Sequence, residues 1–250
     1  MIKLILGDCI EEMKKIPNES IDLVLTDPPY NLSNKVYREF GVDRSKFRSK
    51  IMRRGKPLNF HFGDWDEFER EDFLKFTIKW LTECCRVLKK EGTIISFFNK
   101  EDISFLGWEA YKLGIRTRTI FTWAKSNPVP SFRKVNYLSA TEFIWIGSKG
   151  KWKTFNFKLQ KEMSNYLITS NSSAYGETEH TTEKPLRLIK HFIQIHSNKN
   201  DVILDPMVGS GTTGCACKEL GRNFIGIELN PKYIEMAEKR IQNTQGSLLW

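Results

Sequence analysis

Two consecutive prolines stand directly after an apolar run that is typical of a buried strand. The run covers residues 21–25, and the prolines belong to the stretch Thr26-Asp27-Pro28-Pro29-Tyr30-Asn31. Each proline fixes a φ angle and removes an N–H donor, so the chain must leave the sheet here in one shape. Because ligands bind at the carboxyl ends of strands in open α/β sheets, this position predicts a functional site.

The residue types in this stretch suit the recognition of a planar group that carries an NH2. The Asp27 carboxylate and the Pro28 carbonyl form a rigid pair of acceptors, and Tyr30 adds a flat aromatic face beside them. A nucleobase amino group has this chemistry. We therefore predict a catalytic site made of Asp27, Pro28, Pro29 and Tyr30. The alternative interpretation is a proline-rich turn with a core tyrosine.

Apolar strands alternate with amphipathic helices along most of the chain, a pattern that predicts an α/β fold. The expected strands are 3–6, 21–25, 93–98, 115–123, 140–146, 201–205 and 223–227. The expected helices are 10–16, 68–88, 101–113, 185–196, one that ends at 220 and a last one around 233–241. Lys89-Lys90-Glu91-Gly92 is expected to end the long helix. A length of 250 residues suits a single domain with insertions at 32–60 and 147–179.

The composition argues against several classes of protein. No stretch approaches the roughly 18 apolar residues of a membrane span, and the first residues do not resemble a signal peptide. The five cysteines and four histidines lack the spacing of a metal site. We therefore expect a cytoplasmic protein of prokaryotic or viral type that holds no metal. His191 and His196 are expected on the surface of their helix.

The positive charge of the chain is concentrated directly after the predicted site. The formal net charge is +9, and the segment 33–60 holds nine Lys or Arg residues against two acidic ones. A basic loop in this place predicts contacts with phosphates, whereas the alternative is a solvated loop. The contacts predicted from it are Arg44, Arg48, Arg53 and Arg54.

Two later segments also mix basic and aromatic residues. The strands 115–123 and 140–146 read as a hairpin with a long loop, and residues 147–179 show little periodicity. Trp123 is either a core aromatic or a second face for a stacked base. Interleaved basic and aromatic side chains can hold phosphates and reach bases. The contacts predicted here are Trp123, Lys125, Asn127, Arg133, Lys134, Lys151 and Lys153.

A glycine loop near the carboxyl terminus predicts a nucleotide cofactor. Residues 209–214 fit the pattern G-x-G-x-x-G, and Glu228 follows at the distance of a ribose-binding acid, which taken alone suggests NAD. Asp205 opposes NAD, because a carboxylate at the end of the preceding strand would repel a pyrophosphate but attract an ammonium group. S-adenosylmethionine joins an adenosine to an amino-acid tail and fits better.

In this interpretation Glu228 holds the ribose hydroxyls, and Asp205 and Asp27 lie near the ammonium group. Lys184 and Thr212 are candidates for the carboxylate of the cofactor. Asp8 can also cap the helix that follows it. The full set of predicted cofactor residues is Asp8, Cys9, Asp27, Thr182, Lys184, Asp205, Pro206, Gly209, Ser210, Gly211, Thr212, Glu228 and Leu229.

The order of the two main motifs resembles that of the β-class DNA amino-methyltransferases. Asp-Pro-Pro-Tyr at 27–30 precedes Asp-Pro-Met-Val-Gly-Ser-Gly-Thr-Thr at 205–213. Similar enzymes also carry Gly-Asp-Cys, here at 7–9, a tryptophan hairpin like that at 123–128, and Thr-Glu-Lys-Pro, here at 182–185. The resemblance covers nearly the whole chain.

Two further motifs narrow the resemblance within this class. Gly-Asp-Trp-Asp at 63–66 and Asn-Pro-Val-Pro at 127–130 look most like the bacterial adenine methyltransferases of GATC-modifying systems. The resemblance implies a Rossmann-like class I methyltransferase sheet, circularly permuted, with a small inserted DNA-recognition region. Residues 3–8 should then lie beside 223–228.

The resemblance also implies an activity: methylation of the N6 amino group of an adenine that is flipped out of a specific DNA sequence. A homodimer, and a cognate restriction endonuclease as a partner in the same system, are compatible with it. Methylation of cytosine N4 is the nearest alternative, since the two amino groups are chemically similar. An RNA methyltransferase, a protein-glutamine methyltransferase and a DNA-binding protein without catalysis are the others.

Overall fold

The structure is a computed structural model that describes residues 1–31, 52–53, 56–57, 69–128, 134, 137–170 and 183–246. The chain separates into two compact units, one made of Met1–Pro28 with Trp80–Trp250 and the other of Pro29–Lys79. The second unit holds the short antiparallel strands β3 (Met52–Arg53) and β4 (Lys56–Pro57). Helix α3 (Arg70–Val87) begins in the second unit and ends in the first. The single domain with insertions at 32–60 and 147–179 stays a prediction.

The first unit contains the remaining helices and strands. Its strands are β1 (Ile2–Leu6), β2 (Ile21–Thr26), β5 (Leu88–Phe98), β6 (Ile115–Lys125), β7 (Thr141–Lys149), β8 (Tyr166–Thr169), β9 (Val202–Asp205) and β10 (Asn223–Glu228). Its helices are α1 (Cys9–Met13), α4 (Ile103–Lys112), the 3-10 turn η3 (Gln160–Glu162), α5 (Leu186–His196), α6 (Thr212–Leu220) and α7 (Pro231–Asn243). Among the described residues, no helix combines the length and the apolar character that crossing a membrane requires.

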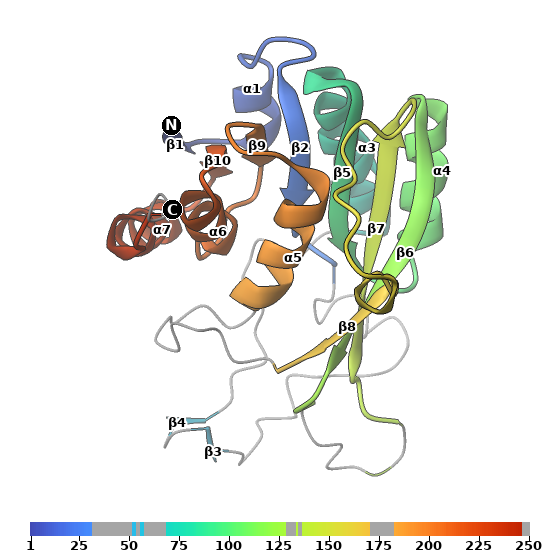
Figure 1. The fold of residues 1–250 in the computed structure, drawn as a ribbon, viewed down its shortest axis with the longest axis vertical. Helices are drawn as coiled ribbons and strands as arrows, with labels where there is room; N and C mark the ends of the chain where they lie inside the picture. Colours follow the sequence, from blue (N-terminus) through green and yellow to red (C-terminus); the bar gives the residue numbers. More distant parts are fainter. Residues whose placement is uncertain are drawn as a thin grey trace. The chain divides into compact units, whose positions relative to one another are not determined.

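The eight strands of the first unit form one sheet in the order β1-β10-β9-β2-β5-β7-β6-β8 (Figure 1). Every pairing is parallel except the two that β7 makes, with β5 and with β6. Strand β2 lies between β9 and β5, so the amino-terminal motif strand sits beside the carboxyl-terminal one. The α/β class and the permuted order of the two motif strands are confirmed.

The pairing of the first strand, β1, with β10 was also predicted from the sequence. β1 pairs in parallel with β10, with Ile2 opposite Phe224 and Leu6 opposite Glu228. This register confirms that residues 3–8 lie beside 223–228. The chain terminus thus completes the edge of the sheet formed by the cofactor-motif strands.

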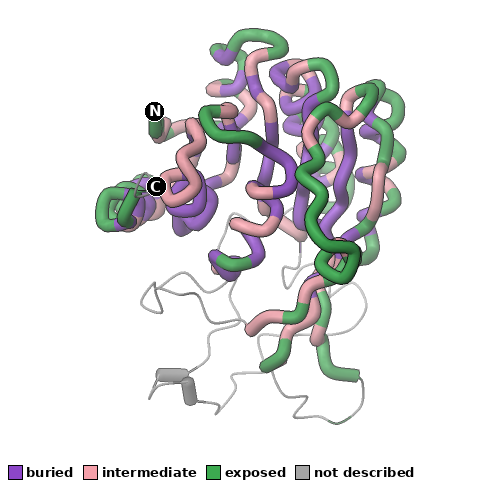
Figure 2. The backbone as a smooth tube through the Cα atoms, in the orientation of Figure 1, coloured by how far each residue is buried: buried purple, intermediate pink, exposed green. Residues whose placement is uncertain are grey.

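The core lies in the central strands, which are buried on both faces (Figure 2). Leu23, Val24 and Leu25 of β2 are at most 1% exposed, as are Ile94 and Ile95 of β5. Figure 1 shows α5 in front of the sheet and α4 behind it. Covered parallel strands read as continuous apolar runs, which is why the sequence located them well.

Two expectations about helices were wrong. Lys89-Lys90-Glu91-Gly92 does not end the long helix, because β5 already begins at Leu88. The register between β2 and β5 shifts at this point, and Glu91 has a φ of 66°. A bulge absorbs the extra residues, and the sequence pattern of a helix end hid it. His196 is only 4% exposed and packs against Trp152 and Phe155, so it belongs to the core rather than to the helix surface.

The segment after β7 runs along the sheet from one edge to the other. The N–H of Lys153 donates to the carbonyl of Glu91 (3.5 Å), and the N–H of Asn156 donates to that of Ile195 (2.8 Å). The chain then forms η3 and adds β8 to the sheet beside β6, so it contributes a strand to the main sheet. Figure 2 shows most of the segment before β8 as exposed. Residues 171–179 of the predicted recognition region lie outside the described residues.

Candidate active site

The carboxyl ends of four parallel strands meet at one edge of the sheet. These strands are β1, β10, β9 and β2, and they deliver Asp8, Glu228, Asp205 and Asp27 in that order across the sheet. The N–H of Gly7 donates to the Glu228 carbonyl over 2.9 Å, which ties the first two strand ends together. Four carboxylates that are far apart in the sequence therefore share one edge.

Asp27 belongs to a cluster of two carboxylates and two lysines. The Lys184 ammonium, only 9% exposed, forms an ion pair with the Asp27 carboxylate. The same ammonium lies 3.5 Å from Glu142, and Lys125 lies 2.6 Å from Glu142. We call these four residues the Asp27 cluster. Its members come from the end of β2, from β6, from β7 and from the residue pair before α5.

Within the Asp27 cluster, neighbouring opposite charges offset the effect of burial on the pKa of Lys184 and Glu142. Burial alone would lower the pKa of Lys184, but the neighbouring Asp27 and Glu142 raise it above the usual value. Burial would likewise raise the pKa of Glu142, but Lys184 and Lys125 lower it. Opposite charges at these distances favour the ionised forms. The charged forms of Lys184 and Glu142 are therefore favoured by the partners that they have in the cluster.

The cofactor half of the edge is built differently. The Glu228 carboxylate accepts from the N–H of Gly209 (2.8 Å) and from the N–H of Asn230 (2.9 Å), one on each oxygen. Burial raises its pKa, and the two backbone donors oppose that shift. A carboxylate offers about four lone-pair sites, so this one is oriented and can still accept from a diol. Its position fits the predicted contact with ribose hydroxyls.

Asp205 is 3% exposed and holds the turn that follows β9. Its carboxylate accepts from the Thr213 hydroxyl (2.7 Å) and from the N–H of Met207 (3.2 Å). Burial raises its pKa to about 7, with the Thr213 and Met207 donors acting against that shift and the charge of Asp27 adding to it. An ammonium group beside it would favour the ionised form, so the predicted role near the cofactor tail fits its electrostatics.

The glycine loop between β9 and α6 needs residues without a side chain. Gly209 and Gly211 have φ angles of 52° and 83°, the left-handed region. A Cβ on Gly211 would also lie 2.8 Å from the Cβ of Ala237. Ser210 and Thr212 are buried beside them. The loop therefore brings its backbone close to α7 and to the carboxyl edge at once.

Thr212 and Lys184 are placed differently from the simplest expectation. The Thr212 hydroxyl lies 3.4 Å from both the Ser210 hydroxyl and the Glu183 carboxylate. Glu183 also forms an ion pair with Arg240. Lys184 reaches Asp27 in this structure. Their predicted contact with a cofactor carboxylate stays a prediction, and Thr182 lies outside the described residues.

The remaining cofactor candidates lie close to these groups. The Asp8 carboxylate accepts from the N–H groups of Ile10 and Glu11, so it caps α1 as one of its two predicted roles requires. Cys9 is buried, and burial raises the pKa of its thiol to about 12, with the charges of Asp8 and Glu228 adding to the shift. Pro206 is buried, whereas Leu229 is 65% exposed.

The residues after Asp27 divide between the two units of the chain. Pro28 ends a segment of the first unit, whereas Pro29 and Tyr30 begin the second. Tyr30 is half-buried within the described residues. The catalytic roles of these three residues stay predictions.

The predicted DNA contacts fall into four groups, one of which is Lys151 with Lys153. Trp123 is 2% exposed, its indole N–H donates to the Thr169 carbonyl (3.3 Å), and its ring lies 5.1 Å from the Lys125 ammonium, which favours the core interpretation. Asn127 and Lys134 are exposed. Nothing is described of the side chains of Arg44, Arg48, Arg53, Arg54 and Arg133.

Lys151 and Lys153 are exposed, but they lie beyond the end of β7, at the amino edge of its neighbour β5. Between Thr93 and Phe98, β5 extends roughly 17 Å toward the carboxyl edge. These two lysines are therefore remote from Asp27.

Sequence reasoning missed two functional contacts at the edge. Glu142 completes the Asp27 cluster, and its signal is a carboxylate at the start of an otherwise apolar strand. Thr213 holds Asp205, and its signal is a hydroxyl within the first turn after the glycine loop. Both depend on neighbours that are distant in the sequence, which a single chain does not reveal.

Comparison with known proteins identifies the family of the chain. The family model described as DNA methylase, covering N6 and N4 methyltransferases, matches residues 21–239. Type II methyltransferase M.HinfI of Haemophilus influenzae is 36% identical over 255 residues, which cover 94% of this chain and 67% of that protein. Type II methyltransferase M2.LlaDCHI of Lactococcus lactis subsp. cremoris is 32% identical over 251 residues, covering 95% of this chain and 88% of that protein.

A solved structure supports the same assignment. The crystal structure of the M1.HpyAVI–SAM complex superposes with a TM-score of 0.72 at 28% sequence identity, covering 96% of this chain and 99% of that chain. The family match spans both motif strands, β2 and β9, and the residues of the Asp27 cluster. The chain therefore belongs to the N6/N4 methyltransferase family of DNA methylases.

Proposed function

We propose that this DNA methylase transfers a methyl group from S-adenosylmethionine to the N6 amino group of an adenine in a specific DNA sequence. The observation that carries the proposal is the Asp27 carboxylate at the end of β2, which forms an ion pair with the buried Lys184. A base that is stacked within a duplex cannot reach a side chain at this edge of the sheet, so the target base must be flipped out. Tyr30, three residues along the chain, is proposed to stack on it.

The chemistry requires acceptors for the amino hydrogens. The lone pair of the amino nitrogen is delocalised into the ring and must be drawn out before it can attack the methyl carbon. Asp27 and the Pro28 carbonyl, by accepting both hydrogens, would favour the pyramidal nitrogen of the transition state. The amino group then loses one proton, for which the Asp27 carboxylate is the nearest proposed acceptor.

The cofactor half fits S-adenosylmethionine, which supplies an electrophilic methyl group on a sulfonium ion. Glu228 is oriented by two backbone donors and would hold the ribose hydroxyls. Asp205, together with Asp27, would lie near the ammonium group, and the loop at Gly209 and Gly211 would approach the cofactor closely. The similar structure of M1.HpyAVI, a SAM complex, supports this choice.

Methylation of cytosine N4 is the second candidate, because its amino group offers the same two hydrogens. A serine replaces the first motif residue in many such enzymes, and Asp27 therefore favours adenine. RNA and protein-glutamine methyltransferases usually carry asparagine at that position. A homodimer and a partner endonuclease remain predictions.

The test is transfer of radiolabelled methyl from S-adenosylmethionine to DNA of mixed sequence, followed by nucleoside analysis. N6-methyladenine in the product is the expected result. N4-methylcytosine would support the same mechanism with cytosine as the target base in place of adenine. Label that enters RNA or protein instead of DNA would overturn the proposal.

The role of Asp27 has its own test. Asp27→Ala should reduce turnover by at least about 10²- to 10³-fold, the usual cost of losing one group that stabilises the transition state. Binding of S-adenosylmethionine, followed by calorimetry, should weaken far less. Retained turnover would exclude Asp27 as the acceptor.

A further inference from the structure

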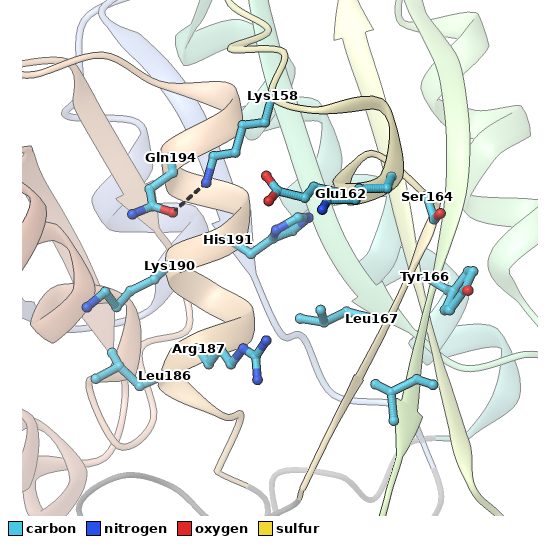
Figure 3. A pocket seen from close by; sticks show the side chains of 12 residues that line it. Lys158, Glu162, Ser164, Tyr166, Leu167, Leu186, Arg187, Lys190, His191 and Gln194 are labelled. Carbon is cyan, nitrogen blue, oxygen red and sulfur yellow. Dashed lines mark hydrogen bonds between the residues drawn. The ribbon is translucent and has the colours of Figure 1, made fainter.

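A groove lies between α5 and the segment that leads into β8 (Figure 3). Its volume is about 660 Å³, and we call it the α5–β8 groove. Residues Leu186 to Gln194 of α5 form one wall, and residues Lys158 to Ile168 form the other. None of the residues that line it belongs to the predicted cofactor or catalytic set.

The walls of the groove are strongly basic. Lys158 and Lys161 stand on one wall and Arg187 and Lys190 on the other, whereas Glu162 is the only acidic residue of the lining. Lys190 is engaged by Glu219 over 2.6 Å. Arg187 and Lys161 are exposed and have no ion-pair partner within the described part of the chain. The groove thus carries an excess of positive charge on both sides.

His191 lines the groove, and its pKa responds to the positive charges of the walls. Figure 3 shows its ring on the α5 wall, pointing toward the opposite wall. Burial lowers the pKa of His191, and the positive charges of Lys158 and Arg187 lower it further. The imidazole is therefore neutral at pH 7, and an anion bound between the walls would raise its pKa.

One end of the groove lies at the same edge of the sheet as the candidate active site. Arg187 lies three residues after Lys184, which pairs with Asp27. β8 runs parallel to β6, so its carboxyl end lies at the same edge of the sheet as Lys125 of the Asp27 cluster. A long anion that reaches Asp27 can therefore extend into the groove.

We propose that the α5–β8 groove binds the phosphodiester backbone of the DNA that flanks the target base. Cations on two facing walls match a chain of phosphates, and Leu167 offers apolar contact for the sugars. The inference rests on the proposed function, because it takes DNA as the substrate. It adds a contact surface separate from the basic loop 33–60.

The test compares DNA binding by Arg187→Ala and by the double variant Arg187→Ala/Lys161→Ala with that of the wild type. Affinity for a duplex is measured by fluorescence anisotropy at several salt concentrations. Each lost phosphate contact should lower the slope of log K against log salt by about 1. The rate at saturating DNA should stay unchanged, since neither residue belongs to the catalytic set. Lys239→Ala, which removes an exposed cation from α7, is the matched control and should not change the slope.

A second measurement separates the two proposals. The pKa of His191 is followed by NMR, with the resonance assigned through His191→Gln, while a short duplex or poly-glutamate is added. A rise in pKa with the duplex supports the groove contact, whatever the methyl-transfer assay gives. An unchanged salt slope in the double variant, or a response of His191 to poly-glutamate and not to DNA, would overturn the inference. Failure of the proposed function shows instead in the nucleoside analysis.

Discussion

The two halves of the carboxyl edge hold their carboxylates by different means. Asp27, after β2, is paired with a lysine side chain that is itself shared with Glu142. Glu228, after β10, is held by two backbone N–H groups, from Gly209 and Asn230. One half depends on the balance of four charges, of which only Lys184 is buried, and the other depends on the path of the backbone.

This difference decides which substitutions each half tolerates. Removing one partner of a buried ion pair leaves a charge without compensation, so the Asp27 cluster should respond to any change of charge. A backbone donor is removed only by a substitution to proline and is otherwise displaced, so the cofactor half should respond to changes of backbone conformation. The half proposed to handle protons is thus the one whose charge balance side chains control.

Lys184→Met is expected to have the largest effect. It leaves the partly buried Asp27 and Glu142 with Lys125 as the one remaining cation of the cluster. Losing one partner of a fully buried pair costs about 3–5 kcal/mol, which is the upper limit for this pair. Urea unfolding followed by circular dichroism measures the loss. Lys184→Arg keeps the charge and is the control. A loss below about 1 kcal/mol for the methionine variant would mean that the cluster is no more than a surface ion pair.

Gly211→Ala tests the backbone half and should cost about 2–3 kcal/mol. The φ of 83° strains any residue with a side chain, and the new Cβ would lie 2.9 Å from the Cα of Ala237. Gly150→Ala is the matched control, since Gly150 has a φ of 78° with nothing within 4 Å of the added Cβ. If both variants lose the same stability, the close approach to α7 contributes nothing.

The sequence predicted more of the cofactor half than of the Asp27 half. The strands β2, β9 and β10 were located because covered parallel strands are continuous apolar runs, and the motif residues follow each of them directly. The donors that orient Glu228 follow from a glycine loop of known shape. That half is encoded locally, within the stretch from β9 to α7.

The Asp27 cluster could not be found in this way. Lys184 is 157 residues from Asp27 along the chain, and Glu142 joins them only because β7 inserts between β5 and β6 in the antiparallel sense. No local pattern specifies such a meeting of strands. The β5 bulge was missed for a different reason. Lys89 to Gly92 has the composition of a helix end, and this local pattern hid the start of the strand.

Glu142→Gln should weaken the Asp27 cluster without dismantling it, at a cost of about 1–2 kcal/mol. The amide keeps an oxygen for Lys125, and Lys184 keeps Asp27, but the attraction between Glu142 and both ammonium groups is lost. Chemical denaturation gives the value. Glu11→Gln, which removes the exposed partner of Lys14, is the control and should change little. Equal effects in the two variants would show that the buried position of Glu142 does not matter.

Asp205 gives the smallest effect and the one that depends on pH. Its pKa is about 7 in the folded protein against 3.8 in the reference state, so between these values the folded form keeps a proton that the unfolded chain has lost. Stability from this group is therefore fully present below pH 3.8, falls as the pH rises, and is constant above pH 7.

Asp205→Asn removes that dependence, because the amide does not titrate. Between pH 5 and 6, the stability of the wild type relative to Asp205→Asn should fall by about 1 kcal/mol. Urea unfolding of both proteins in the same buffers measures the difference. A difference that stays constant or grows with pH would show that Asp205 is already ionised. The contrast between the two halves would then reduce to the partners that each carboxylate uses.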